Sequence, residues 1–241
     1  MNGESVNQIK ELAIRSMDLK EVNGNQYSPE TLVRVFSDPR PVAILVKSLT
    51  GIIDFLEANI DELDMDSLIL HVVDCATVRV ITKIHGERNE RHSVICADLD
   101  IVKTFPFGQF MDQETFIIKC RSMFVPTDDM DRILKYTSKI DASASIKTED
   151  DGVTQIARIK KGASGVIAEN EALPVIIKLR PYRTFPDVEQ PESEFLFRMN
   201  ASDDSITCAL FESDGGNWRN TARKNIAGYF ELLEVTIPII S

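Results

Sequence analysis

The chain has 241 residues, a hydrophobic content of 43%, a charged content of 27% and a formal net charge of −11. This composition is ordinary for a soluble globular protein that buries its core without disulfide staples, and the acidic balance excludes wrapping of nucleic acid by the whole surface. No apolar run reaches the ~18 residues of a membrane helix. The first ten residues lack the apolar core of a signal peptide, so we expect a cytoplasmic protein with no membrane partner.

The first part of the chain mixes helices and strands. An amphipathic helix is predicted over 5–21, and a loop over 23–30, where Asn-Gly and Ser-Pro pairs favour turns. Apolar residues at helical spacing predict a second helix over 49–60. Strands are predicted over 42–46, 67–73, 78–84 and 92–97. Apolar and polar residues alternate along 78–84, which indicates a sheet with one face on a core and the other partly in solvent.

The rest of the chain pairs helices with a second sheet. Helices beginning near Asp112 and Thr127 are expected to cover one face of a sheet. Further elements are a hairpin over 144–160, strands over 174–180, 195–199 and 206–211, and a helix over 217–233. The tail over 234–240 either ends as a strand or docks on the body of the protein or on another subunit.

These patterns predict an α+β fold. We expect a single domain or two intimate halves: a mixed half with helices over 1–140, and a C-terminal antiparallel sheet closed by a helix over 141–241. Neither an internal repeat nor a low-complexity segment interrupts the chain.

The cysteines and histidines do not form a metal motif. Cys75, Cys96, Cys120 and Cys208 each lie in an apolar run without CxxC spacing, so we expect small buried hydrophobes. The three histidines are His71, His85 and His92. The last two lie at the ends of a predicted hairpin and could face each other, which leaves a histidine metal site as the alternative to solvent-exposed side chains. We expect no metal and no cofactor.

One part of the chain is locally basic, in contrast to the chain's net negative charge. Its basic residues are Arg158, Lys160, Lys161, Lys178, Arg180 and Arg183. If the strand faces that carry them coincide, a basic stripe crosses the C-terminal sheet and could follow a phosphate backbone. The alternative is that these cations pair with the acids at 187–194.

Two groups of acids suggest other functions. The first group is Asp187, Glu189, Glu192, Glu194, Glu212 and Asp214. It could hold a metal ion for hydrolysis of nucleic acid, although a (D/E)xK core is missing. The second group surrounds the helix predicted over 49–60 and comprises Asp54, Glu57, Asp61, Glu62, Asp64 and Asp66. It is a solvated face or a patch that binds a partner. No GxSxG elbow or phosphate-binding loop predicts catalytic residues.

The stretch 179–218 is the most densely specified part of the chain. We interpret it as the signature of the fold, and of a partner surface, through Tyr182, Arg183, Phe185, Gln190, Pro191, Arg198, Asp214, Gly215, Gly216 and Trp218. Trp218 begins the last helix, and it is either an anchor that holds the helix on the sheet or a stacking platform for a base or a partner.

The sequences PYRTFPDVEQPESEFLFR and ALFESDGGNWRNTARKNI resemble a family of phage and prophage proteins of low-GC Gram-positive bacteria that contain a domain of unknown function. The resemblance covers roughly 42–230 and implies no catalytic residues. It implies a gene among the early DNA-metabolism genes of a phage.

The leading hypothesis is a non-enzymatic phage accessory protein of the host cytoplasm, oligomeric and acting in DNA metabolism, with nucleic-acid contact through the basic strand face. The alternatives are an anti-defence or host-inhibiting protein that binds a host protein through its acidic face, a metal-dependent enzyme on nucleic acid, and a virion structural protein. The possible partners are therefore DNA, a host protein and further copies of the chain.

Overall fold

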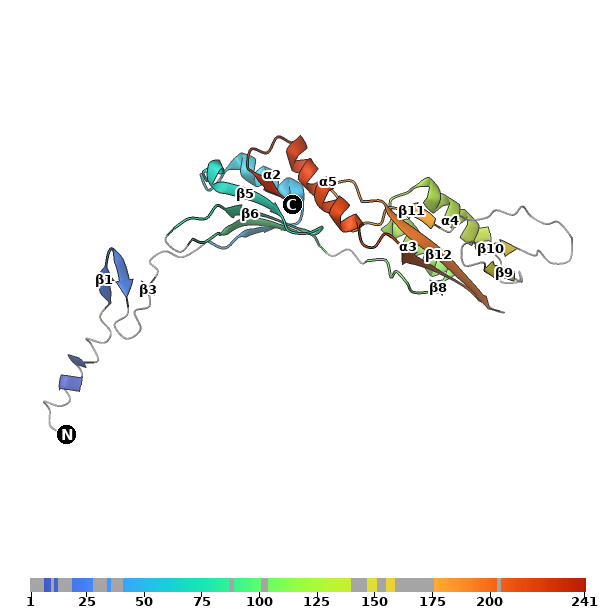
Figure 1. Cartoon of the computed structure of the whole chain (residues 1–241), viewed down its shortest axis with the longest axis horizontal. Helices are drawn as coiled ribbons and strands as arrows, with labels where there is room; N and C mark the ends of the chain where they lie inside the picture. The colour runs from blue at the N-terminus through green and yellow to red at the C-terminus, as the bar shows by residue number, and fades with distance from the viewer. Residues whose placement is uncertain are drawn as a thin grey trace. The chain divides into compact units, whose positions relative to one another are not determined.

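The computed structural model describes the following residues: 7–9, 11–12, 19–27, 34–35, 41–86, 89–100, 104–139, 147–150, 155–158, 176–202 and 205–241. The chain divides into two compact units, Met1–Val42 and Ala43–Ser241. The fold is α+β, with helices and separate sheets in the larger unit (Figure 1). Within the described residues no helix is long and apolar enough to cross a membrane.

The first unit contains a small sheet of three antiparallel strands, β1 (Lys20–Val22), β2 (Asn25–Tyr27) and β3 (Arg34–Val35). Asn23 and Gly24 connect β1 to β2, both with positive φ, which a two-residue hairpin turn requires. The Asn-Gly pair thus forms a turn as expected. The strands on either side of it differ from the prediction, because β1 overlaps the end of the helix predicted over 5–21 and β2 lies within the loop predicted over 23–30. Most of that helix lies outside the described residues.

The second unit begins with a five-stranded sheet in the order β14-β5-β6-β7-β4. Its strands are β4 (Ile44–Val46), β5 (Leu68–Val72), β6 (Thr77–Thr82), β7 (Ser93–Asp98) and β14 (Ile239–Ile240). Antiparallel pairing joins β5, β6 and β7, whereas β4 and β14 add to the two edges in parallel. The predicted tail after residue 234 therefore ends as an edge strand of this sheet.

Two helices cover the same face of the five-stranded sheet, α2 (Leu49–Ala58) and α5 (Trp218–Leu232) (Figure 1). Ser48 caps α2 by accepting the backbone N–H of Gly51, and the short 3-10 helix η1 (Met65–Ser67) leads into β5. The core between sheet and helices contains Leu49, Ile52, Phe55, Leu68, Leu70, Val72, Val78, Val80, Ile95, Ala97, Ile226, Ala227 and Phe230.

In the described part of the chain, α2 and α5 leave the opposite face of the five-stranded sheet without a helix. One side chain from each strand forms a row across it, in the order Ile240, His71, Arg79, Cys96 and Leu45. This mixture of apolar and polar residues confirms the sheet with one core face and one partly solvated face that the alternation along 78–84 predicts.

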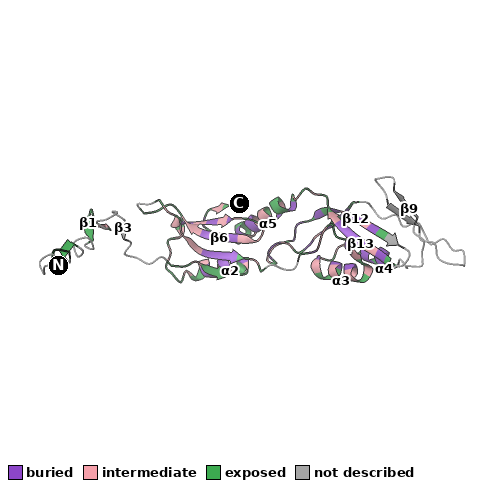
Figure 2. Cartoon of the chain, turned by 90° about the horizontal axis from the view of Figure 1, so that it is seen from below, coloured by how far each residue is buried: buried purple, intermediate pink, exposed green. Residues whose placement is uncertain are grey.

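The second sheet of this unit has four antiparallel strands in the order β11-β12-β13-β8. They are β8 (Met111–Asp112), β11 (Ile176–Leu179), β12 (Ser193–Ser202) and β13 (Ser205–Glu212). Its core face packs against α3 (Gln113–Met123) and α4 (Asp128–Lys139), as expected for these two helices. Figure 2 shows the buried residues on the strands and on the inner faces of the helices.

Phenylalanine rings dominate the core beneath the four-stranded sheet. Phe105, Phe116, Phe124, Phe195 and Phe197 are buried there, and their ring centroids lie 5.1–6.3 Å apart in mostly tilted or edge-to-face contacts. Aromatic pairs in these arrangements add stability beyond the area that they bury.

A separate two-stranded sheet is formed by β9 (Lys147–Asp150) and β10 (Gln155–Arg158). This hairpin matches the one predicted over 144–160, with the acidic residues 149–150 in the strand rather than in the turn.

The observed division differs from the halves expected over 1–140 and 141–241. The boundary between compact units follows Val42, and α5 packs on the five-stranded sheet whereas α3 and α4 cover the four-stranded sheet. Both cores therefore draw residues from both sides of position 140. The cores are composed in this way because each sheet must bury one apolar face, and the helices that pack on that face come from distant segments of the chain.

Candidate functional site

The densely specified stretch joins the two cores of the larger unit. Arg183 lies among rings of the four-stranded sheet's core region, while Phe185, two residues later, is fully buried in the core of the five-stranded sheet. Between them Thr184 donates from Oγ1 to the carbonyl of Cys75, at 2.6 Å. Three successive residues thus hold the two sheets together.

The Arg183 side chain is only 6% exposed, and its guanidinium carbon lies 4.4 Å from the ring centroid of Trp218. The rings of Phe107 and Phe195 lie at 5.3 and 5.4 Å. An ion pair with Glu212 neutralises the charge, and Ser193 Oγ accepts a second hydrogen bond at 3.0 Å. Burial lowers the pKa of Arg183, and the carboxylate of Glu212 opposes this shift.

Gln190 fixes the backbone of this stretch. Its Oε1 accepts the backbone N–H groups of Arg183 and Thr184, and its Nε2 donates to the carbonyls of Thr184 and Phe185, all at 2.9–3.2 Å. The Phe185 carbonyl also accepts the backbone N–H of Val188 at 3.3 Å, but the other three groups have no further hydrogen-bond partner among the described residues, and Gln190 itself is buried away from water. One side chain therefore satisfies four backbone groups of a loop that has no strand to pair with.

Two carboxylates tie the same region to helices. Asp187 accepts from Thr50 Oγ1 at 2.7 Å and from the backbone N–H groups of Thr50 and Leu49 at the start of α2. Asp214 accepts from the N–H groups of Gly216 and Trp218 and caps the start of α5. Gly215 and Gly216 both have positive φ, which suits glycine in the tight turn before that helix.

Most other signature residues are also placed within this framework. Pro191 is buried, and Tyr182 is partly exposed and donates its backbone N–H to the carbonyl of Met123 at 3.0 Å. Trp218 is buried against Arg183, with Arg219 also over its ring at 4.7 Å. The anchor interpretation of Trp218 therefore fits its surroundings, whereas a buried ring cannot offer a stacking platform.

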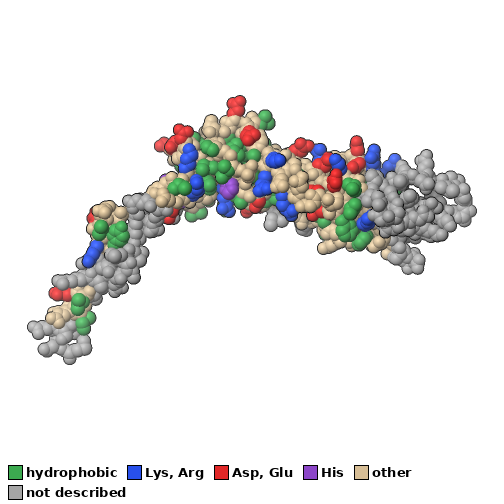
Figure 3. Space-filling model, viewed as in Figure 1, with side chains coloured by type: hydrophobic (Ala, Val, Ile, Leu, Met, Phe, Trp, Pro, Cys, Tyr) green, Lys and Arg blue, Asp and Glu red, His purple; other side chains and the backbone are tan. Residues whose placement is uncertain are grey.

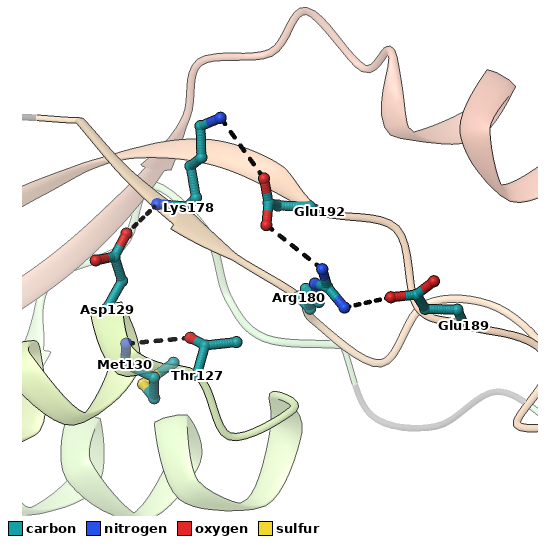
Figure 4. Close-up of polar contacts among 7 residues, drawn as sticks. All are labelled: Thr127, Asp129, Met130, Lys178, Arg180, Glu189 and Glu192. Atoms are coloured by element: carbon teal, nitrogen blue, oxygen red, sulfur yellow. Dashed lines mark hydrogen bonds and ion pairs between the residues drawn. The ribbon is translucent and has the colours of Figure 1, made fainter.

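The predicted basic face is largely ion-paired where the structure describes it. Glu189, Arg180, Glu192 and Lys178 form a chain of opposite charges along the edge strand β11 (Figure 4). Lys178 also donates its backbone N–H to Asp129 at 3.1 Å, at the start of α4. These contacts match the alternative in which the cations pair with the acids at 187–194.

The continuous basic stripe is not formed by the described residues. Arg158 lies on β10, which belongs to a different sheet from β11, and Arg183 is buried. Lys160 and Lys161 lie outside the described residues. The expectation of one basic stripe over one sheet is therefore wrong for two residues. Among the described residues β10, which carries Arg158, pairs only with β9, and the Arg183 side chain is turned inward.

The face of the four-stranded sheet opposite α3 and α4, its open face among the described residues, carries an apolar row that was not predicted from the sequence. Cross-strand pairing aligns Ile176, Leu196 and Phe211, and the ring of Phe110 lies 6.0 Å from that of Phe211 in an edge-to-face contact. Ile176 is 51% and Phe110 42% exposed. Leu196 and Phe211 in this row are half-buried. The alternation along 195–198 could have predicted this row. Phe195 and Phe197 are buried, and Leu196 and Arg198, which alternate with them, must therefore point to the opposite face of the strand.

Arg198 belongs to this open face. It alternates with the buried Phe197 and Met199 on β12 and lies opposite Ala209. Among the described residues no acid lies within ion-pair distance of its side chain. The sheet therefore presents a strip of apolar and aromatic side chains, the row of Ile176, Leu196, Phe211 and Phe110, with Arg198 on one side and Lys178 on the other.

The acidic face of α2 and η1 is solvent-exposed. Its six carboxylates are those of Asp54, Glu57, Asp61, Glu62, Asp64 and Asp66. None of them has an ion-pair partner within the described parts of the chain, and Ile60 at the end of the helix is 74% exposed among them. Figure 3 shows carboxylates gathered over the part of the molecule where α2 and η1 lie.

The acids proposed for metal-dependent hydrolysis do not converge on one point. Glu189 and Glu192 pair with Arg180, Glu212 pairs with Arg183, and Asp187 and Asp214 bind backbone N–H groups. In the described parts of the chain no group of three or more His, Cys, Asp or Glu side chains could hold a metal ion. Internal pairing is the role that the structure gives to the carboxylates of Asp187, Glu189, Glu192, Glu212 and Asp214.

Three of the four cysteines are buried as expected, and Cys75 is half-buried. Burial raises the pKa of Cys208 to about 12, and it also raises the pKa of Cys75 and Cys120 above their ordinary value. Because the thiolate is the reactive form, these side chains act as packing residues at neutral pH.

Comparisons of the chain with models of protein families, with curated proteins and with solved structures find no match. The resemblance to a phage and prophage family therefore stays a prediction from the motif 181–198 and its partner 209–226.

We predict that Gln190→Ala lowers the free energy of unfolding by about 2–4 kcal/mol, since it leaves buried backbone donors and acceptors unpaired. Urea unfolding followed by circular dichroism measures this change. The matched control is Gln109→Ala, because Gln109 is exposed and its loss should change stability by less than about 0.5 kcal/mol. Equal stabilities of the two variants would contradict the role given to Gln190.

A second prediction concerns pH. Burial raises the pKa of Asp187, but its hydrogen bonds from Thr50 and Leu49 outweigh burial and leave the pKa below its ordinary value. The charged form is thus favoured in the folded state, so its contribution is complete above about pH 4 and is lost as pH falls through the folded pKa. The stability difference between wild type and Asp187→Asn should therefore shrink from pH 6 to pH 2.5. Urea titrations at several pH values measure it, and a difference that grows on acidification would contradict the assignment.

Proposed function

We propose that this chain is a non-enzymatic accessory protein of a phage or prophage that acts in DNA metabolism by binding single-stranded nucleic acid. The observation that supports it best is the apolar strip on the open face of the four-stranded sheet, with Phe110 and Phe211 in contact beside Arg198. Open sheet faces with exposed aromatic rings and cations are a common platform for single strands, because every base has a ring face that can stack.

The basic residues contribute less than the sequence analysis expects. Arg180 and Arg183 are engaged with acids, and Lys178 shares Glu192. Stacking is therefore the main source of affinity in this proposal, and phosphate contacts are few. With one or two phosphates neutralised, the logarithm of affinity should fall with the logarithm of salt with a slope of only about −0.7 to −1.4.

The overall charge of −11 favours this mode over duplex binding. A duplex shields the faces of its bases and offers mainly phosphates, which an acidic protein repels. A single strand offers unstacked bases to an apolar strip, so the net repulsion is offset by stacking of about 1–3 kcal/mol per base.

The proposal predicts that Phe211→Ala weakens binding of a fluorescent oligothymidine roughly 5- to 100-fold, as loss of one stacked base requires. Arg198→Ala should weaken it less and reduce the salt slope by about 0.7, the value for one phosphate contact on a single strand. Fluorescence anisotropy at two salt concentrations gives both values. The matched control is Arg79→Ala, which removes an exposed cation from the open face of the other sheet. Absence of binding by wild type at low salt, or equal losses in all three variants, would overturn the proposal.

A second candidate is a host-inhibiting protein that binds a basic region of a host protein through its acidic face. The observation that favours it is the set of unpaired carboxylates around the exposed Ile60. These carboxylates have no ion-pair partner among the described residues and are complementary to a basic surface, and the exposed isoleucine among them offers an apolar anchor.

For this candidate, a triple variant Asp54→Asn, Glu57→Gln and Asp61→Asn should lose a host partner that wild type retains. The control neutralises three exposed acids elsewhere, Asp128→Asn, Glu231→Gln and Glu234→Gln, and so changes the net charge equally. Quantitative affinity capture from host lysate measures the recovery. The same recovery with both triple variants would contradict a specific acidic surface, because only net charge would then matter.

A further inference from the structure

Two histidines face each other at the exposed end of the β6–β7 hairpin. His85 pairs with Glu90 in an antiparallel bridge, with backbone N–H to carbonyl distances of 3.1 and 3.2 Å. The ring centroids of His85 and His92 lie 4.7 Å apart, and the ring planes are inclined by 70°. Their places at the two ends of the hairpin predict that they could face each other, and the structure brings them into contact.

The Nδ1 atom of His85 lies near two oxygens. It is 3.0 Å from the carbonyl oxygen of Lys83, which can only accept, and 3.2 Å from Thr82 Oγ1. In the tautomer that satisfies this carbonyl, Nδ1 carries the proton and Nε2 of the neutral ring keeps its lone pair. Metal-binding histidines commonly donate their other ring N–H to a backbone carbonyl in this way, which fixes the tautomer and the ring orientation.

The other arm of the hairpin is also held in place. His92 donates its backbone N–H to Thr82 Oγ1 at 2.9 Å, and the same hydroxyl lies 3.2 Å from His85 Nδ1. Thr82 thus links the two histidine positions across the hairpin. Because both positions are fixed through the backbone, bringing the two rings onto one ion costs little conformational freedom.

We propose that His85 and His92 form a binding site for a divalent late transition-metal ion such as Zn²⁺, Ni²⁺ or Cu²⁺. Neutral imidazole suits these ions, and nitrogens about 2.0–2.1 Å from one ion lie roughly 3–3.5 Å apart, as two rings in contact permit. His85 is exposed and His92 half-buried, so an ion and its remaining water ligands can reach the pair from solvent.

The surroundings limit the strength of this site. Lys83 and Arg91 flank it, although the Arg91 guanidinium donates to the Thr82 carbonyl at 3.4 Å. No third protein ligand joins the pair among the described residues. The site therefore holds an ion through two protein ligands and links the two arms of the hairpin. It does not depend on the nucleic-acid proposal.

The three histidines allow a direct test, because their imidazole proton resonances can be followed separately by NMR during titration with ZnCl₂. We expect the resonances of His85 and His92 to shift together at sub-millimolar zinc while those of His71 stay unchanged. His85→Ala and His92→Ala should each weaken zinc binding at least tenfold. The matched control is His71→Ala, which removes the histidine on the open face of the five-stranded sheet and should bind as wild type.

Several outcomes would overturn the site. They are unchanged His85 and His92 resonances at millimolar zinc, wild-type affinity in either hairpin variant, or loss of binding in Cys75→Ser, which would place zinc on the half-buried thiol. Circular dichroism of each variant shows whether a loss of zinc binding comes from unfolding of the protein. Since both histidine side chains lie at the hairpin end rather than in a core, we expect spectra like that of wild type.

Discussion

The larger unit depends on the burial of one guanidinium group. A charge taken out of water costs several kcal/mol unless it is paired and hydrogen-bonded, and Arg183 is held by Glu212 and Ser193 beneath the ring of Trp218. The tryptophan is the first residue of α5, and the rest of that helix covers the five-stranded sheet. Arg183 thereby connects the core of one sheet to the helix that closes the other.

The same constraint explains why the stretch 179–218 is so densely specified. Its buried side chains fill two cores. The Gln190 side-chain amide bonds to the backbone of a loop without strand partners. The carboxylate of Asp214 caps α5, and that of Asp187 binds the start of α2. Residues that perform these tasks are directed inward, and the surfaces open to a ligand lie on other faces. The open sheet faces and the exposed carboxylates of α2 and η1 are therefore where binding is to be sought, and each proposal here concerns one of these outer surfaces or the hairpin end.

Much of the fold was predictable because the periodicity of hydrophobic residues indicates which side of a helix or strand is buried. Leu49, Ile52 and Phe55 follow helical spacing in α2, and Val78 and Val80 alternate with polar residues in β6, so both elements and the half-solvated sheet follow from the sequence. The hydrophobic periodicity of the sequence does not indicate which helix packs on which sheet. That α5 packs on the first sheet depends on long-range contacts of Ile226 and Phe230, which no local pattern encodes.

The candidate sites were less predictable for a related reason. Lys178 and Arg180 look like a cationic strand face in the sequence, but their charges are matched by Glu189 and Glu192 across a loop. The apolar strip depends on register, because Ile176, Leu196 and Phe211 become neighbours only when three strands align. The histidine pair was foreseeable from the hairpin, whereas the Lys83 carbonyl 3.0 Å from His85 Nδ1 was not.

Photo-crosslinking tests the central claim most directly. A single-stranded oligonucleotide containing bromodeoxyuridine would be irradiated with the protein, and the linked peptides would be mapped by mass spectrometry. Stacking on the open face of the four-stranded sheet predicts crosslinks at Phe110 or Phe211, competed by unlabelled single strands. Crosslinks confined to other surfaces, or none at saturating protein, would contradict the account and direct attention to the acidic face of α2 and η1.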